Sequence, residues 1–99
     1  MSYYPVQLDK TRNFKYGMKA ISLVEKKFKK PMSKIDMDDL TMEETATLLW
    51  AGLVHEERAL TPDKVMDLVD DYSNVVTVAK IMGEAISDAF GAGEEEKND

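Results

Sequence analysis

Hydrophobic and less hydrophobic positions alternate at the start of the chain with a period of two. The hydrophobic members are Tyr4, Val6 and Leu8 before a turn at 9–11, and Phe14 and Tyr16 after it. This alternation is typical of half-buried strands and predicts a β-hairpin over residues 4–16. Because an isolated two-stranded hairpin is weak in water, we expect it to pack against the rest of the domain.

In four later segments, hydrophobic residues recur three and four positions apart, which predicts amphipathic helices. The first predicted helix covers residues 17–29, and Pro31 follows its end. Its expected buried stripe is Met18, Ile21, Val24 and Phe28. The expected core anchors in the connection 31–40 are Ile35, Met37 and Leu40.

The second helix has the clearest start signal. Thr41 and Glu44 have the spacing of a capping box, in which each side chain accepts a hydrogen bond from the other's backbone amide. The expected stripe is Met42, Ala46, Leu49 and Leu53. Gly52 costs this helix about 1 kcal/mol relative to alanine, so its presence indicates close packing of helices at that point.

Two further start signals follow. Thr61 and Pro62 suit the N-cap and first position of a third helix, and either Ser73 or Asn74 caps a fourth. The expected stripes are Val65, Leu68, Val69 and Tyr72 in the third helix, and Val75, Val78, Ala79, Met82, Ala85, Ile86, Ala89 and Phe90 in the fourth. Gly91 is the expected stop.

These elements predict a mainly α fold, with about four helices and a short N-terminal β-hairpin. It is either a small α+β domain or nearly all-α, and it occupies residues 1–91 as a single helical domain. Residues 92–99 are acidic and lack a hydrophobic pattern, so we expect a disordered tail.

The charge is unevenly distributed along the 99 residues, which carry a net charge of −6. Residues 1–34 hold nine Lys and Arg against two acids, whereas residues 35–99 hold four against seventeen. We expect the two parts to fold together and offset one another locally. The acidic majority argues against nucleic-acid binding. No apolar run approaches the roughly 20 residues of a membrane span, and the first residues do not resemble a secretion signal. A cytoplasmic location is expected.

A search for catalytic or metal-binding patterns is negative. The chain has no cysteine and one histidine, His55, which we interpret as a residue at a helix C-terminus. Asp36, Asp38 and Asp39 lack the glycine and glutamate of a calcium loop. Asp67, Asp70 and Asp71 are either solvated charges or an acidic patch for a partner. No phosphate-binding glycine pattern is present. We expect a protein that is not an enzyme and has no cofactor.

Methionine is frequent, with seven in 99 residues. Methionine adapts its shape and is often used where proteins bind apolar helices. Met1 is the initiator, and Met18, Met42 and Met82 lie on predicted core stripes. This leaves Met32, Met37 and Met66 as partner-binding candidates. Trp50 is the fourth candidate, because tryptophan often anchors interfaces. For Trp50 the core and the interface are equally good expectations.

The order of several segments resembles a known family. They are Val6–Lys10, Lys19–Ile21, Val24–Glu25, Leu48–Leu53 and Leu60–Val65, followed by Asp70. Together they resemble the tail assembly chaperones of long-tailed phages and of related prophages in Gram-positive bacteria, over about residues 5–90. The matching motifs are structural and not catalytic.

The resemblance implies a role in tail morphogenesis in the host cytoplasm. Such proteins coat the long helical tape measure protein, keep it soluble, help to recruit tail tube subunits, and leave before the virion is complete. Weak self-association between basic and acidic parts, involving Lys26 and Lys27, is a hypothesis for how copies would line up. Many members have a longer form made by translational frameshifting, and Glu96–Asn98 can be encoded by a slippery heptamer.

Two other functions stay open from the sequence. One is a minor structural tail or connector protein, which would remain in the finished particle. The other is a small acidic regulatory adaptor, whose negative surface would mimic nucleic-acid phosphates. The basic first third of the chain argues against the adaptor.

Overall fold

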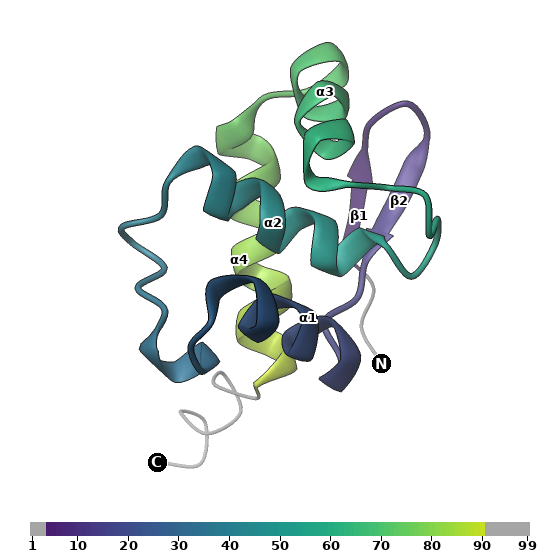
Figure 1. Ribbon diagram of the computed structural model, residues 1–99. Coiled ribbons are helices and arrows are strands. Elements are labelled where there is room, and N and C mark those ends of the chain that lie inside the picture. Colours follow the sequence, from purple (N-terminus) through teal and green to yellow (C-terminus); the bar gives the residue numbers. More distant parts are fainter. Residues whose placement is uncertain (1–3, 91–99) are drawn as a thin grey trace, which may run out of the picture.

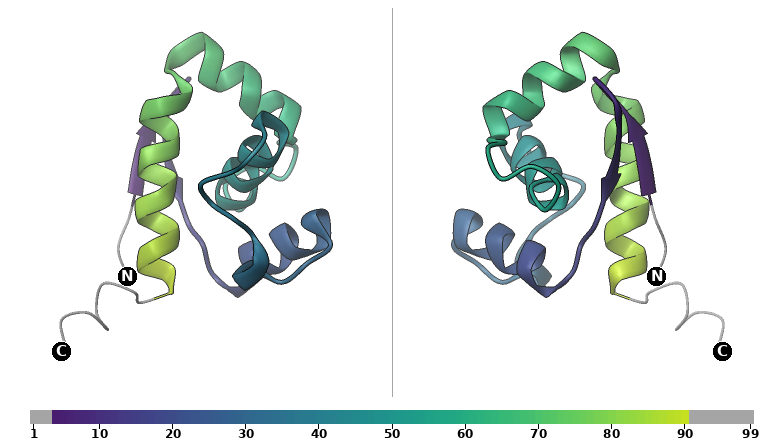
Figure 2. Two further views of the ribbon diagram at one scale, coloured as in Figure 1. Left: turned by 90° about the vertical axis from the view of Figure 1, so that its left-hand side faces the viewer. Right: turned by 90° about the vertical axis from the view of Figure 1, so that its right-hand side faces the viewer.

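The computed structural model describes residues 4–90, and the expected tail and the stop at Gly91 lie outside them. The elements are β1 (Tyr4–Gln7), β2 (Thr11–Phe14), α1 (Met18–Phe28), the 3₁₀ turn η1 (Met32–Lys34), α2 (Met42–Leu53), α3 (Pro62–Tyr72) and α4 (Val75–Ala89). This confirms the small, mainly helical α+β fold. Figures 1 and 2 show α4 beside the hairpin on one side, α1 and α2 on the other, and α3 across one end.

The hairpin pairs β1 with β2 in antiparallel register, from Tyr4 opposite Phe14 to Gln7 opposite Thr11. The expected packing of the hairpin is confirmed, because β1 contacts α4 and β2 contacts α2. Helix α2 also contacts the three other α-helices, so it forms the centre of the core. The buried hydrophobic residues of the hairpin and the following link are Val6, Leu8, Phe14 and Tyr16.

Arg12 lies on the inner face of the hairpin, opposite Val6, and is only 3% exposed. Its Nε and Nη2 each donate a hydrogen bond of 2.9 Å to the Asp9 carboxylate. Its Nη1 lies 3.1 Å from Glu57 Oε1, within ion-pair distance, but makes no well-formed hydrogen bond. The ion pair to Glu57 joins the basic first third to the acidic remainder, as expected for charges that offset locally.

Three helices start at the predicted caps. The Thr41 hydroxyl accepts from the Glu44 amide at 3.1 Å, and the Glu44 carboxylate accepts from the Thr41 amide at 2.8 Å, which completes the capping box. Thr61 caps α3 through Lys64 N. Asn74, and not Ser73, caps α4, because its Oδ1 accepts from Thr77 N at 2.9 Å. These bonds satisfy amides that the first helical turn leaves without a partner.

The predicted helical stripes are correct in the middle of each helix and wrong at several helix ends. The expected core residues that are exposed are Met18 (91%), Met42 (62%), Tyr72 (57%), Phe90 (53%), Val75 (37%), Met37 (37%) and Ala89. All except Met37 stand at or directly beyond a helix end. At these ends the chain leaves the neighbouring elements, so the residue stays at the surface even though its position matches the stripe. Leu53, at the end of α2, keeps its neighbours and is buried as predicted.

The core itself lies where α2 crosses the other elements. The fully buried larger side chains are Phe14, Leu48, Leu53, Val6, Val24, Val65 and Val78. Of the anchors expected in the 31–40 connection, Ile35 is buried and Leu40 is half-buried against the core. Among residues 4–90, no helix is both long and apolar enough to cross a membrane.

Candidate functional site

A small groove between α2 and α3, closed at one end by the start of α4, is the candidate partner-binding site. We call it the α2–α3 groove. Its lining residues are Met42, Thr45, Ala46, Leu49, Met66, Val69, Asp70 and Val75, and its volume is about 160 Å³. The floor residues Ala46, Leu49 and Val69 are buried, whereas Met42 on the rim is 62% exposed.

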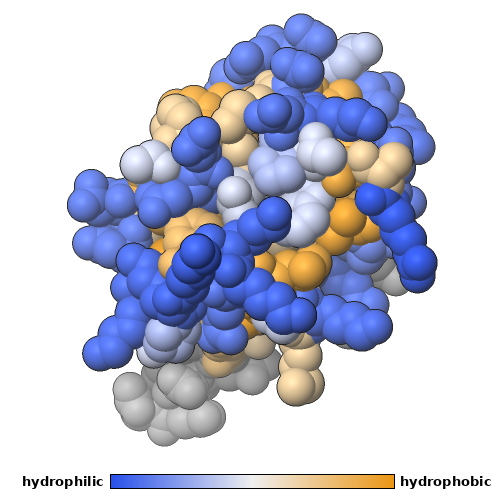
Figure 3. All heavy atoms as spheres, viewed as in Figure 1, coloured by the Kyte–Doolittle hydropathy of each residue, from blue (hydrophilic) through white to orange (hydrophobic). Residues whose placement is uncertain are grey.

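The size and lining of this groove suit a single large apolar side chain. A cavity of roughly 150 Å³ holds one benzene-sized group, so the groove accommodates one such side chain of a partner. Two flexible methionines stand at its edge and adapt to different shapes. Figure 3 shows other points where apolar atoms reach the surface between charged side chains.

The structure places one of the four candidate partner-binding residues in this groove, namely Met66. Met37 is partly exposed in the connection before α2, and Met32 is half-buried in η1 against the core. Met42 was expected in the core and is instead exposed at the rim of the groove. Its position directly after the N-cap is the sequence signal for this, because the first helical residue often lies outside the packed region.

Trp50 is half-buried and makes structural contacts. Its Nε1 donates to the carbonyl oxygen of Leu60 at 2.9 Å, which ties α2 to the start of α3. Lys27 Nζ lies 5.6 Å from the centre of its ring, in the range of a cation–π contact. The ring also packs against the hydrophobic core. A role for Trp50 in binding a partner stays a prediction.

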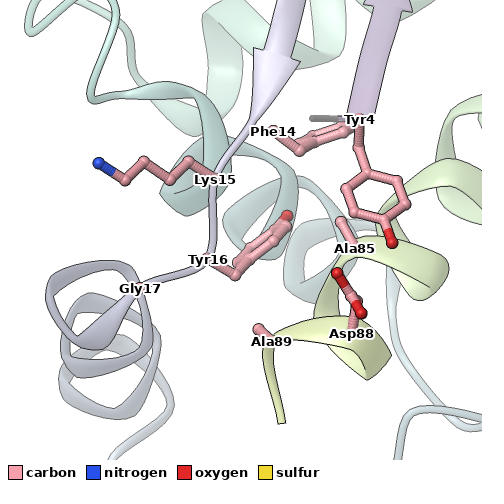
Figure 4. A pocket seen from close by; sticks show the side chains of 8 residues that line it. All are labelled: Tyr4, Phe14, Lys15, Tyr16, Gly17, Ala85, Asp88 and Ala89. Carbon is pink, nitrogen blue, oxygen red and sulfur yellow. The ribbon is translucent and has the colours of Figure 1, made fainter. Parts of the chain in front are cut away.

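A second hollow, of about 420 Å³, lies between the hairpin and the end of α4. Figure 4 shows Tyr4, Phe14 and Tyr16 on one side and Ala85, Asp88 and Ala89 on the other. Burial, followed by the nearby Asp88 carboxylate, raises the pKa of Tyr4. Burial also raises the pKa of Tyr16. Both phenols are therefore neutral at physiological pH.

His55 lies in the loop after α2, two residues beyond its last residue, Leu53. Its Nε2 is 2.8 Å from the carbonyl oxygen of Asn13, and the Glu56 carboxylate accepts from the Asn13 amide at 3.3 Å. These contacts hold the loop against β2, which gives His55 a structural role. Within residues 4–90, no three His, Asp or Glu side chains are grouped so that they can hold a metal ion.

Tyr16 gives a prediction for alkaline pH. Its hydroxyl donates to the carbonyl oxygen of Leu48 at 2.7 Å inside the core, and burial raises its pKa above the ordinary value of 10.0. The unfolded chain therefore loses this proton first, so the free energy of unfolding falls as the pH rises above about 10. In Tyr16→Phe we expect a loss of about 1 kcal/mol at neutral pH and a flatter alkaline limb.

Urea denaturation of both proteins across neutral and alkaline pH measures this effect. Tyr72→Phe is the matched control, because Tyr72 is 57% exposed, and it should keep the alkaline slope of the parent protein. An unchanged slope in Tyr16→Phe would mean that the Tyr16 phenol does not limit alkaline stability.

Comparison with known proteins found no relative of this chain. No protein-family model, curated protein or solved structure matches the chain.

Proposed function

We propose that this protein is a phage tail assembly chaperone, a non-catalytic module of the host cytoplasm. It binds the tape measure protein, keeps it soluble and helps to recruit tail tube subunits, and it is absent from the mature virion. The observation that carries the proposal is the α2–α3 groove, in which a buried apolar floor is bordered by Met42 and Met66. The resemblance of residues 5–90 to this family supports the same role.

The groove suits the task because a long tape measure helix exposes apolar side chains that would otherwise aggregate. An amphipathic helix binds such a groove through anchor residues on one face. One buried aliphatic anchor contributes about 1.5–3 kcal/mol, less than the 4 kcal/mol or more that association costs in lost freedom. A single copy therefore binds weakly, and several copies side by side on one helix bind well.

Weak contacts between copies would strengthen this arrangement. The exposed residues Lys26, Lys27, Lys29 and Lys30 at the end of α1 make no ion pair with a carboxylate of residues 4–90. The acidic residues Asp67, Asp70 and Asp71 of α3 are also exposed. A head-to-tail contact between these two surfaces is an open-ended interaction that extends along a filament.

Co-expression with the tape measure protein encoded beside this chain tests the proposal. We expect the tape measure protein to become soluble and to co-purify with the chaperone. The gene should lie between a tail tube gene and a very long tape measure gene. Detection of the chain in purified virions by mass spectrometry would favour a structural tail protein instead.

A substitution at the rim tests the groove itself. In Met42→Glu we expect tape measure binding to weaken about tenfold, since the loss of an interface hot spot costs about 1–2 kcal/mol. An acid in the first turn of α2 suits the helix dipole, so the fold should be preserved. The measurement is the amount of tape measure protein recovered in a pull-down at several bait concentrations.

Met37→Glu distinguishes the groove from the other predicted binding position, because Met37 is an exposed methionine that does not line the groove. If the α2–α3 groove is the binding surface, this variant should bind the tape measure protein like the parent chain. If Met37→Glu abolished binding and Met42→Glu did not, the binding surface would lie in the 31–40 connection and not in the α2–α3 groove.

A further inference from the structure

A third hollow, larger than the two described above, lies between the start of α1 and the end of α2. We call it the basic groove. Its lining residues are Lys15, Gly17, Met18, Lys19, Ala20, Leu23, Ala51, Val54, His55 and Arg58, and its volume is about 510 Å³. It shares no lining residue with the α2–α3 groove. The small buried residues Ala20 and Ala51 leave room for a partner between the two helices.

The charge of this groove is opposite to that of the whole chain. Lys15, Lys19 and Arg58 line it together with His55, and its lining contains no acid, although the net charge of the chain is −6. The two acids that precede Arg58 in the sequence pair with other residues. Glu56 accepts hydrogen bonds from Asn13, and Glu57 pairs with Arg12.

The three cations are therefore available to a partner. Within residues 4–90, no carboxylate lies within 4.0 Å of the side-chain nitrogens of Lys15, Lys19 or Arg58. The start of α1 adds to the positive potential, since Gly17 provides no side-chain cap and the first turn holds no acid. A ligand with carboxylates is therefore attracted to this groove, whereas the acidic remainder of the surface repels it.

The apolar floor of the groove indicates what kind of molecule carries the carboxylates that bind there. Ala20, Leu23, Ala51 and Val54 form an apolar strip between the cations. A single-stranded nucleic acid is usually held by aromatic side chains on which its bases stack, and the lining contains none. An amphipathic helix meets both requirements, because it presents a narrow apolar stripe with charged residues on either side.

We propose that the basic groove docks an amphipathic helix of a partner protein, with an apolar stripe flanked by glutamate or aspartate. The apolar stripe lies on Leu23 and Val54, and the flanking carboxylates pair with Lys15, Lys19 and Arg58. This partner differs from the one in the α2–α3 groove, where Asp70 on the rim repels acidic segments. The protein therefore has two docking surfaces that select their partners by charge.

The test uses two labelled synthetic peptides of about 18 residues, long enough to form a helix. Both carry leucines at helical spacing, and the flanking residues are glutamate in one peptide and lysine in the other. Fluorescence polarisation should show binding of the glutamate peptide at low salt. The binding should fall strongly at about 1 M salt, where screening acts over about 3 Å, and the lysine peptide should not bind.

The double variant Lys19→Glu with Arg58→Glu should bind the glutamate peptide at least about tenfold more weakly, since each exposed ion pair contributes up to about 1 kcal/mol. Lys19→Glu places an acid in the first turn of α1 and favours that helix. The matched control is Lys34→Glu with Lys80→Glu, which changes the charge equally at exposed positions outside both grooves. It should bind like the parent chain.

Several outcomes would overturn the proposal. These are no binding of the glutamate peptide, equal binding of both peptides, or equal weakening by the double variant and its control. Preferential binding of a single-stranded oligonucleotide or of phosphatidylserine vesicles would show that the groove recognises phosphates. Met42→Glu should leave peptide binding unchanged, so this result is independent of whether the α2–α3 groove binds a tape measure protein.

Discussion

Replacement of Gly52 by alanine is expected to lower the free energy of unfolding by about 1–3 kcal/mol, although alanine is the better helix former. A Cβ atom at this position would lie 2.5 Å from Cζ and 2.6 Å from Oη of Tyr16. Such overpacking of a core costs about 1–3 kcal/mol. Displacement of Tyr16 would also break its hydrogen bond to Leu48, about 1 kcal/mol, which offsets the gain in helix propensity.

The surroundings prevent an easy relaxation. Tyr16 is 8% exposed and stacks on Phe14, with the ring centres 5.9 Å apart. The backbone cannot shift freely either, because the Gly52 carbonyl oxygen accepts a hydrogen bond of 2.9 Å from Lys15 N. Close helix packing was predicted at Gly52, whereas the structure shows close packing against the side chain of Tyr16, in the link between β2 and α1.

Gly83→Ala is the matched control for this experiment. Gly83 lies inside α4, and a Cβ there would have nothing within 4 Å. This variant should gain up to about 1 kcal/mol from helix propensity. Urea denaturation of the two variants should therefore show changes of opposite sign. Equal stabilisation of both would mean that Tyr16 moves aside without cost.

Replacement of Arg12 by methionine is expected to cost about 2–3 kcal/mol. Removal of one partner from a buried ion pair costs about 3–5 kcal/mol. The value should be lower here because the side chains of Asp9 and Glu57 are 33% and 44% exposed and regain water. Methionine keeps most of the apolar stem, so the loss reports on the guanidinium group that joins the hairpin to the loop after α2.

The same variant should change the response to acid. The Arg12 guanidinium lowers the pKa of Asp9 below its ordinary value of 3.8. The unfolded chain therefore takes up this proton first, and stability falls as the pH drops below about 4 towards the lowered pKa. In Arg12→Met this part of the acid dependence should disappear.

Lys10→Met removes the same charge from an exposed position of the same hairpin, and it is the control. We expect it to change the free energy of unfolding by less than about 0.5 kcal/mol. Denaturation with urea at neutral pH and near pH 3 gives both quantities. An effect of Lys10→Met as large as that of Arg12→Met would assign the loss to net charge and not to the buried contacts.

Part of the candidate site was visible in the sequence. Met66 was predicted as an adaptable binding residue, and it lines the α2–α3 groove. Met42 was assigned to the core because its spacing matches Ala46 and Leu49, and the structure places it at the rim. Spacing along a helix shows which side a residue faces, but it does not show where the neighbouring element ends.

Arg12 and the basic groove also show which features the sequence predicts and which only the folded structure decides. The period of two that identifies Phe14 as buried also places Arg12 on the inner face, so the burial of Arg12 could be predicted from the pattern. Its pairing with Glu57 could not be predicted, because the two residues are 45 positions apart and meet only after folding. Lys15, Lys19 and Arg58 come together in the basic groove for the same reason.

By itself, the sequence determined the hairpin, the starts of α2 and α3 at Thr41 and Thr61, the start of α4 to within Ser73 and Asn74, and the residues in the middle of each helical stripe. These features depend on hydrogen bonds and spacings within a few residues. Only the tertiary structure decided which helix ends emerge from the core, why residue 52 is glycine, and which side chains form the two grooves. These depend on contacts between distant segments, and local patterns carry no information about the distance between such segments.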